Sequence, residues 1–205
     1  MGLRKRAVED ELETVVLERG YETLLLALRS ESALNRRDAV RELSAYPQAV
    51  TDLLNTLTSE PEHAVREALL GALQQLGGEP VVAGLITLLR SEDAVLRNGA
   101  IEVLQTMPEG VALHMLELLN DRDSDVRIFA IDILQQLAHP QAPEWLLSVL
   151  KDETHINVVS TAVDRLAEVG RAEMVPELMA IKQRFPKEAY LAFAVDLACR
   201  RIEEV

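Results

Sequence analysis

Histidines, one cysteine and a cluster of carboxylates are the groups in this 205-residue chain that could bind a metal or support catalysis. Imidazole, thiolate and carboxylate groups ligate transition metals, and an imidazole beside a nucleophile can act as a general base. The four histidines are His63, His114, His139 and His155. None is followed by a glutamate, and no two occupy the same position of neighbouring helices. We therefore expect no metal site.

The acidic segment 121–125, with the sequence DRDSD, has the oxygen-rich composition of a calcium loop. It lacks the central glycine and the final glutamate that such a loop requires, so we expect it to cap a helix. The single Cys199 cannot form an internal disulfide, and its apolar surroundings predict a buried thiol. No nucleotide, nucleophile or zinc motif occurs with supporting context. We therefore expect no catalytic residue and no cofactor, and that the chain is not an enzyme.

Arginines recur at a regular spacing and could bind anions along a track. Arg36, Arg66, Arg97 and Arg127 lie 30, 31 and 30 residues apart. Acidic turns accompany them, and their carboxylates can pair with guanidinium groups. The candidates are Glu60, Glu62, Asp93, Asp121, Asp123 and Asp125. We predict that this arginine ladder forms structural ion pairs.

The same period governs the apolar residues. Segments 64–78, 95–109 and 125–139 can be aligned on their arginines. Counted from the apolar residue just before the arginine, apolar residues recur at offsets 0, 4, 5, 8 and 11 in each segment. That spacing lies on one face of a helix and does not fit a strand. A second apolar block precedes each segment, so each unit of about 31 residues is a pair of helices. Such a pair cannot bury its apolar face alone, and stacking of neighbours is predicted.

The predicted fold is all-α, an α-α superhelix of five to six helical hairpins plus an N-terminal helix. We expect a single array over residues 1–205. It comprises an N-terminal capping helix in 1–20, five repeats in 21–171 and a divergent C-terminal capping repeat in 172–205. Glycine and proline between the units, as in Gly77-Gly78 and Pro140, agree with helix ends there.

Composition and charge limit the classes of partner that the chain is expected to bind. Aromatic residues form 3% of the chain and the formal net charge is −13. Nucleic acids and anionic membranes attract basic surfaces, so we expect neither as a partner. No apolar run is long enough to cross a membrane and no signal peptide is recognisable, which predicts a cytoplasmic protein. The scarcity of aromatic side chains also argues against a small-molecule ligand.

The units resemble HEAT repeats, specifically the short bacterial kind found in phycobilin-lyase-type (PBS lyase HEAT-like) proteins. The resemblance rests on an acidic turn followed by Val-Arg, an Ala-apolar pair and a distal Leu, as in DSDVRIFAIDIL (123–134) and EHAVREALLGAL (62–73). It covers about 150 residues and implies a solenoid whose second helices line the concave side. It implies two functional classes, a binding scaffold or a lyase component that acts with a partner chain.

The outward residues of the second helices form the predicted partner-binding surface. They combine an acidic stripe with a row of glutamines, and the apolar pair Ile128 and Phe129 interrupts them. Phe129 either anchors a partner or packs on a neighbouring helix. The candidate residues are Asn98, Glu102, Gln105, Ile128, Phe129, Asp132, Gln135 and Asp164.

From these features we expect a non-catalytic interaction scaffold, or adaptor, that binds a basic or amphipathic protein or peptide on its acidic concave surface. The alternative is a phycobilin-lyase-like enzyme component, or a chaperone-like subunit, that acts with a partner chain.

Overall fold

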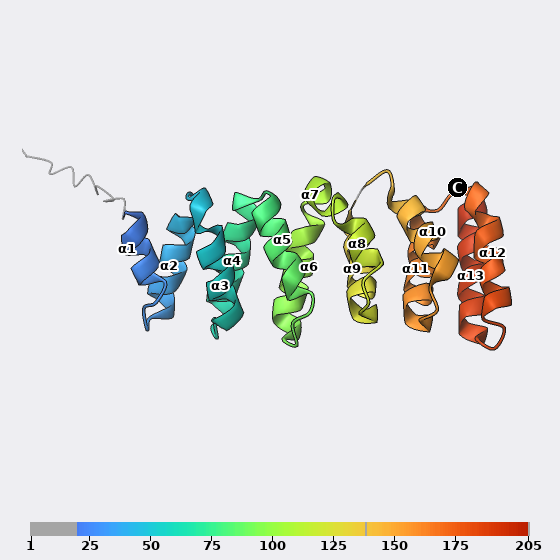
Figure 1. The fold of residues 1–205 in the computed structure, drawn as a ribbon, viewed down its shortest axis with the longest axis horizontal. Helices are drawn as coiled ribbons and strands as arrows, with labels where there is room; N and C mark the ends of the chain where they lie inside the picture. Colours follow the sequence, from blue (N-terminus) through green and yellow to red (C-terminus); the bar gives the residue numbers. More distant parts are fainter. Residues whose placement is uncertain (1–19, 138, 205) are drawn as a thin grey trace, which may run out of the picture.

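The structure is a computed structural model that describes residues 20–137 and 139–204. Within these ranges the chain forms helices and connecting turns, with no strand. Helical hairpins follow one another along the long axis of the molecule, in the order of the sequence (Figure 1). The predicted all-α superhelix of helical hairpins is therefore confirmed. The N-terminal capping helix predicted in 1–20 lies, except for Gly20, outside the described residues.

The hairpins form two layers of helices. The first helices make layer A, which comprises α1 (Tyr21–Ala27), α3 (Val50–Ser59), α5 (Glu79–Leu88), α7 (Pro108–Ala112) with α8 (Met115–Leu119), α10 (Ala142–Asp152) and α12 (Val175–Arg184). The second helices make layer B, which comprises α2 (Ala33–Leu43), α4 (His63–Leu76), α6 (Ala94–Gln105), α9 (Ser124–Gln136), α11 (Ile156–Val169) and α13 (Ala189–Glu203). Short 3₁₀ turns at Pro47–Ala49 and Ala172–Met174 precede α3 and α12. Each helix packs mainly on its own hairpin and on the adjacent ones.

A continuous apolar core separates the two layers. In α4, Val65, Leu69 and Leu73 are buried, which are positions 0, 4 and 8 of the predicted apolar pattern. The same positions are buried in α9 and α11, where alanine replaces leucine at the middle position, as in Ala130. Small side chains at this position let neighbouring B helices approach closely. The apolar period of the sequence is thus the packing period of the array.

Carboxylates and glycines set the ends of the helices. Oδ1 of Asp93 accepts hydrogen bonds from the backbone N–H groups of Val95 and Leu96, at 2.9 and 3.2 Å, and so caps α6. Asp123 caps α9 in the same way through the N–H of Asp125. These side chains satisfy donors that have no partner inside a helix. The DRDSD segment therefore serves as a helix cap, as expected.

The arginine ladder joins successive hairpins at one edge of the array. Nε and Nη2 of Arg36 donate to the two carboxylate oxygens of Glu60, at 2.8 and 2.6 Å. Arg127 binds Glu153 in the same two-pronged manner, at 2.7 and 3.1 Å. In each case the acid belongs to the turn of the next hairpin, so the ion pair connects two units.

Two positions of the ladder depart from this pattern. Arg66 makes a single contact with its acid, through Nη1 to Oδ2 of Asp93 at 2.7 Å. The guanidinium of Arg97 has no carboxylate partner among the described residues. It donates to the carbonyl of Ser91 and lies over the ring of Phe129, 4.9 Å from the ring centroid.

The fourth hairpin has an interrupted first helix. Layer A is divided there into α7 and α8, with Leu113 and His114 between them. Nε2 of His114 lies 2.8 Å from Oε1 of Glu79 at the start of α5. The histidine thus links two hairpins. Among the described residues, no helix has the length and apolar character needed to cross a membrane.

Candidate functional site

The outward surface of layer B, called the B face here, carries the predicted partner-binding residues. Each of them follows position 0 of the apolar pattern in its helix by two, three, six or nine residues. Because position 0 is buried against the core, residues at these spacings point away from layer A. Asn98, Glu102, Gln135 and Asp164 are exposed. Gln105, Ile128, Phe129 and Asp132 are half-buried. All eight residues come from three adjacent helices, α6, α9 and α11.

Of the two alternatives that the sequence left open for Phe129, the structure shows packing within the array. Its ring packs against the core, and the guanidinium of Arg97 lies over its face. A cation above an aromatic face is attracted by the ring quadrupole, so this contact replaces the missing ion pair of the ladder. Much of the side chain is therefore engaged within the array.

The glutamine row contributes hydrogen bonds between hairpins. Nε2 of Gln105 donates to the backbone carbonyl of Asp132 at 3.0 Å, which joins α6 to α9. Nε2 of Gln74 donates to the hydroxyl of Thr106 at 3.3 Å, which joins α4 to α6. Gln135 remains exposed at the end of α9. Part of the predicted binding surface thus holds neighbouring units together.

Two carboxylates of the acidic stripe, the half-buried Asp132 and the more exposed Asp164, have raised pKa values. Burial raises the pKa of Asp132 above its ordinary value, and the charge of Arg165 offsets this only in part. Burial likewise raises the pKa of Asp164, on the next helix. Desolvation penalises the charged form of an acid. A cationic or hydrogen-bond-donating ligand would relieve that penalty, so these positions suit a partner of such chemistry.

A partly enclosed cavity of about 250 Å³ lies between α4 and α6. Apolar side chains form one side of it, with Leu70 and the exposed Val95 among them, and Asn98 and Glu102 contribute polar groups. Two of the predicted residues therefore border a hollow. The sequence did not predict the hollow. Gly99 and Leu70 both line it, and the side chain of Leu70 occupies the space that a side chain at position 99 would need.

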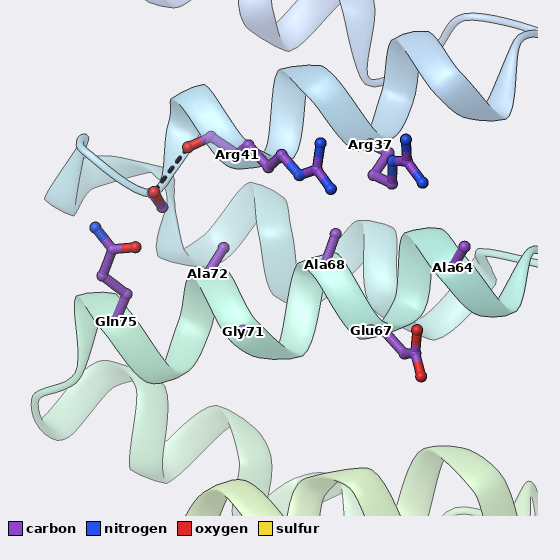
Figure 2. Close-up of a pocket in the computed structure, with 9 residues that line it drawn as sticks. Arg37, Arg41, Ala64, Glu67, Ala68, Gly71, Ala72 and Gln75 are labelled. Carbon is purple, nitrogen blue, oxygen red and sulfur yellow. Dashed lines mark hydrogen bonds between the residues drawn. The ribbon is translucent and has the colours of Figure 1, made fainter.

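A second cavity, of about 450 Å³, lies between α2 and α4 at the N-terminal end of the B face. Figure 2 shows Arg37 and Arg41 of α2 on one wall and Ala64, Ala68 and Ala72 of α4 on the other. The hollow follows from the small residues of α4 that face α2. Both cavities open on the B face, so the face can receive ligands of small-molecule size.

The reactive groups of the described chain are few. The thiol of Cys199 is buried in α13, and burial raises its pKa, which disfavours the nucleophilic thiolate. Within residues 20–137 and 139–204, no group of three histidine, cysteine or acidic side chains could hold a metal ion.

Known proteins resemble this chain in sequence and in fold. The bilin biosynthesis protein PecE of Mastigocladus laminosus is 30% identical over 151 residues, which cover 72% of this chain and 56% of PecE. The chain thus spans a little over half the length of that relative.

Solved structures also align with this chain, at lower identity. A designed armadillo repeat protein aligns over 88% of this chain and 98% of its own, at 17% identity and a TM-score of 0.39. The complex of CpcE and CpcF of phycocyanin lyase from Nostoc sp. aligns over 98% and 100%, at 18% identity and a TM-score of 0.39.

The similarity to a bilin biosynthesis protein contradicts the prediction that this chain is not an enzyme. That prediction rested on the absence of catalytic motifs, and a component of a multi-chain enzyme need not carry one. The prediction of a HEAT-repeat protein is confirmed. A family model described as HEAT repeats matches residues 21–105 and 112–188, well over half of the chain, and the chain belongs to the HEAT-repeat family.

Proposed function

We propose that this chain is a bilin-binding component of a phycobilin-lyase-type enzyme and that it acts together with a partner chain. The observation that carries the proposal is the 30% identity with PecE, a bilin biosynthesis protein, over 72% of this chain. The proposal follows the lyase-type alternative and departs from the expectation that no small molecule is bound.

The geometry of the B face supports the proposal. Bilins are linear tetrapyrroles, with an extended conjugated body, pyrrolic N–H donors and two propionate groups. The two cavities of the B face lie on adjacent helix pairs, α2 with α4 and α4 with α6, and Glu67 borders both. They lie on the two sides of α4, and their walls combine apolar surface with charged groups. A ligand of this length and mixed polarity matches such a surface.

The acidic stripe of Glu102, Asp132 and Asp164 is the part of the B face that we assign to the partner chain. The two aspartates have raised pKa values because burial disfavours their charge. Arginine or lysine side chains of a partner would compensate these carboxylates. The full set proposed to contact the partner is Asn98, Glu102, Gln105, Ile128, Phe129, Asp132, Gln135 and Asp164.

Bilin binding is tested by titrating the purified chain into a solution of biliverdin, a linear tetrapyrrole, and recording the visible absorption spectrum. Binding extends and orients the tetrapyrrole, so we expect a saturable change in its long-wavelength band. The heat-unfolded chain at the same concentration serves as the control. A spectrum that stays unchanged with the folded chain in excess would contradict the proposal.

The partner surface is tested by charge reversal, using the double variant Asp132→Lys/Asp164→Lys as bait. We expect the wild-type chain to retain a partner from its native cells that the variant loses, with the melting temperature unchanged. The matched control is Glu62→Lys/Asp125→Lys, which reverses two exposed turn carboxylates. Equal retention of the partner by both variants would remove the acidic stripe from the interface, and a lower melting temperature would assign the aspartates a structural role.

A further inference from the structure

The cavity between α2 and α4 differs from the rest of the B face in its charge. Arg37 and Arg41 extend from α2 along the wall that faces the alanines of α4 (Figure 2). The chain as a whole has a formal charge of −13. Two neighbouring guanidinium groups in a hollow of about 450 Å³ are therefore a local positive site on an acidic protein.

The charge of these arginines is poorly compensated by the described part of the chain. Nε of Arg37 is buried and has no hydrogen-bond partner there. Nη1 of Arg41 lies 3.6 Å from Oδ1 of Asp38, and both of these side chains are largely exposed. Glu67 borders the cavity, but its side chain points away from the arginines in Figure 2. By contrast, the adjacent Arg36 has both its Nε and its Nη2 bound to Glu60.

The array does not need basic residues at these two positions. The corresponding residues of the next four B helices are neutral or acidic, namely Glu67 with Gly71, Asn98 with Glu102, Ile128 with Asp132 and Ser160 with Asp164. Like charges four residues apart on a helix repel each other and slightly destabilise it. Among the described residues, no contact therefore requires both positions to be basic, and an anionic ligand would supply a reason.

The opposite wall has little side-chain bulk. Ala64, Ala68 and Ala72 project toward α2, and Gly71 lies beside them. A Cβ atom added at Gly71 would meet nothing within 4 Å, so no packing contact requires glycine there. Glycine inside a helix is unfavourable compared with alanine. An open, weakly polar wall opposite two cations fits a ligand with a flat apolar body and carboxylate substituents.

We propose that Arg37 and Arg41 bind the propionate carboxylates of the bilin, while its conjugated body lies on the alanine and glycine wall of α4. This inference rests on the proposed function and adds the position and orientation of the tetrapyrrole. Guanidinium groups bind carboxylates through paired, charge-assisted hydrogen bonds. The arginines then determine which end of the array receives the propionate side of the ligand.

Biliverdin and its dimethyl ester are the two probes that test the inference. The ester keeps the conjugated body and removes both negative charges. We expect Arg37→Gln/Arg41→Gln to raise the dissociation constant for biliverdin about tenfold or more and to leave that for the ester nearly unchanged. The control is Arg29→Gln/Arg122→Gln, which removes two exposed turn arginines and should bind both probes like the wild type.

Gly71→Leu tests the wall independently of charge. The added side chain enters open space, so the helix should remain folded while the cavity is filled, and we expect the binding of both probes to weaken by about tenfold or more. Three outcomes would overturn the inference. In the first, the wild type binds biliverdin and the arginine variant binds it equally well. In the second, the wild type binds biliverdin and the arginine variant loses affinity for biliverdin and for the ester to the same extent. In the third, the wild type binds neither probe, and the proposed function then fails as well.

Discussion

The carboxylate of Glu60 is a nearly buried charge, since the residue is only 3% exposed. It accepts two hydrogen bonds from Arg36 and one from the backbone N–H of Glu62. We expect Glu60→Gln to lower the free energy of unfolding by about 3 kcal/mol, because it leaves the charge of Arg36 without a counter-ion in a poorly solvated place. Denaturant unfolding at neutral pH measures the change.

The exposed Glu62 in the same turn provides the control. Glu62→Gln should alter stability by no more than about 0.5 kcal/mol. The hydrogen bond from Arg36 lowers the pKa of Glu60, so its stabilising effect is complete above the ordinary value of about 4.3 and disappears as the pH falls through the lowered pKa. The difference between wild type and Glu60→Gln should shrink over that acidic range. A difference independent of pH would show that the ion pair contributes nothing.

Asp132 has the opposite pH dependence. Burial raises its pKa, so the folded state binds a proton more readily than the unfolded state does. In the window from about 3.9 up to the raised pKa, wild-type stability therefore increases as the pH falls. We expect Asp132→Asn to raise the free energy of unfolding at pH 7 by up to about 0.5 kcal/mol. Urea unfolding of both proteins at several pH values tests this, and a destabilised variant at pH 7 would contradict it.

Single side chains could be predicted from the sequence where a repeat constrains them. The ladder arginines and most of their acidic turns recur at fixed spacing, so their pairing was foreseeable. The contact of Arg97 with Phe129 was not, because the phenylalanine occurs in one unit only and a period gives no information about an isolated residue. Glu153 is not among the acids expected to pair, and its contact with Arg127 depends on the distance between two hairpins.

At the scale of helices, two glycines should respond in opposite ways to the same change. Gly71 in α4 has open space where a side chain would lie, so Gly71→Ala should raise the free energy of unfolding by about 0.5–1 kcal/mol. Gly84 in α5 faces Leu54 of α3, whose Cδ1 atom would clash with an added Cβ. Gly84→Ala should lower stability by about 1–3 kcal/mol. Thermal unfolding measures both variants, and equal shifts would show that helix propensity alone decides.

The helices were predictable because apolar positions repeat with helical spacing. The breaks within helices were harder to predict. Val65, Leu69 and Leu73 indicate both the existence of α4 and its buried side. The division of the fourth A helix at Leu113 and His114 has no strong signal in the sequence. The cavities were also beyond prediction, because their depth depends on how closely two helices approach and on which small residues then face each other.

At the scale of the whole molecule, nearest-neighbour packing predicts a position-dependent response to core damage. Leu24 in the first described hairpin and Leu104 in the third are both fully buried. Leu24→Ala and Leu104→Ala should each weaken their hairpin by about 2–5 kcal/mol. Because hairpins contact mainly their neighbours, Leu24→Ala should unfold α1 and α2 locally. Leu104→Ala should instead lower the protection of amides from hydrogen exchange in the hairpins on both sides of it.

Hydrogen exchange with mass spectrometry reads out both variants peptide by peptide. The expected signature of Leu24→Ala is rapid exchange confined to α1 and α2, with α9 to α13 exchanging as in the wild type. Uniform acceleration along the whole chain would mean that the array unfolds as one cooperative unit.

The two edges of the array are fastened with different strengths. At the edge of the A–B turns, charge-assisted pairs such as Arg36 with Glu60 and Arg127 with Glu153 connect the hairpins. At the opposite edge, where the B helices end, neutral bonds such as Gln74 with Thr106 join hairpins. The contact of His114 with Glu79 and the ion pair of Arg171 with Glu144 also lie at this edge, but their side chains are more exposed. We expect thermal motion to separate the hairpins more at the edge where the B helices end than at the ion-paired edge of the A–B turns. Such elasticity would widen the space between B helices while a rigid ligand enters and restore it afterwards.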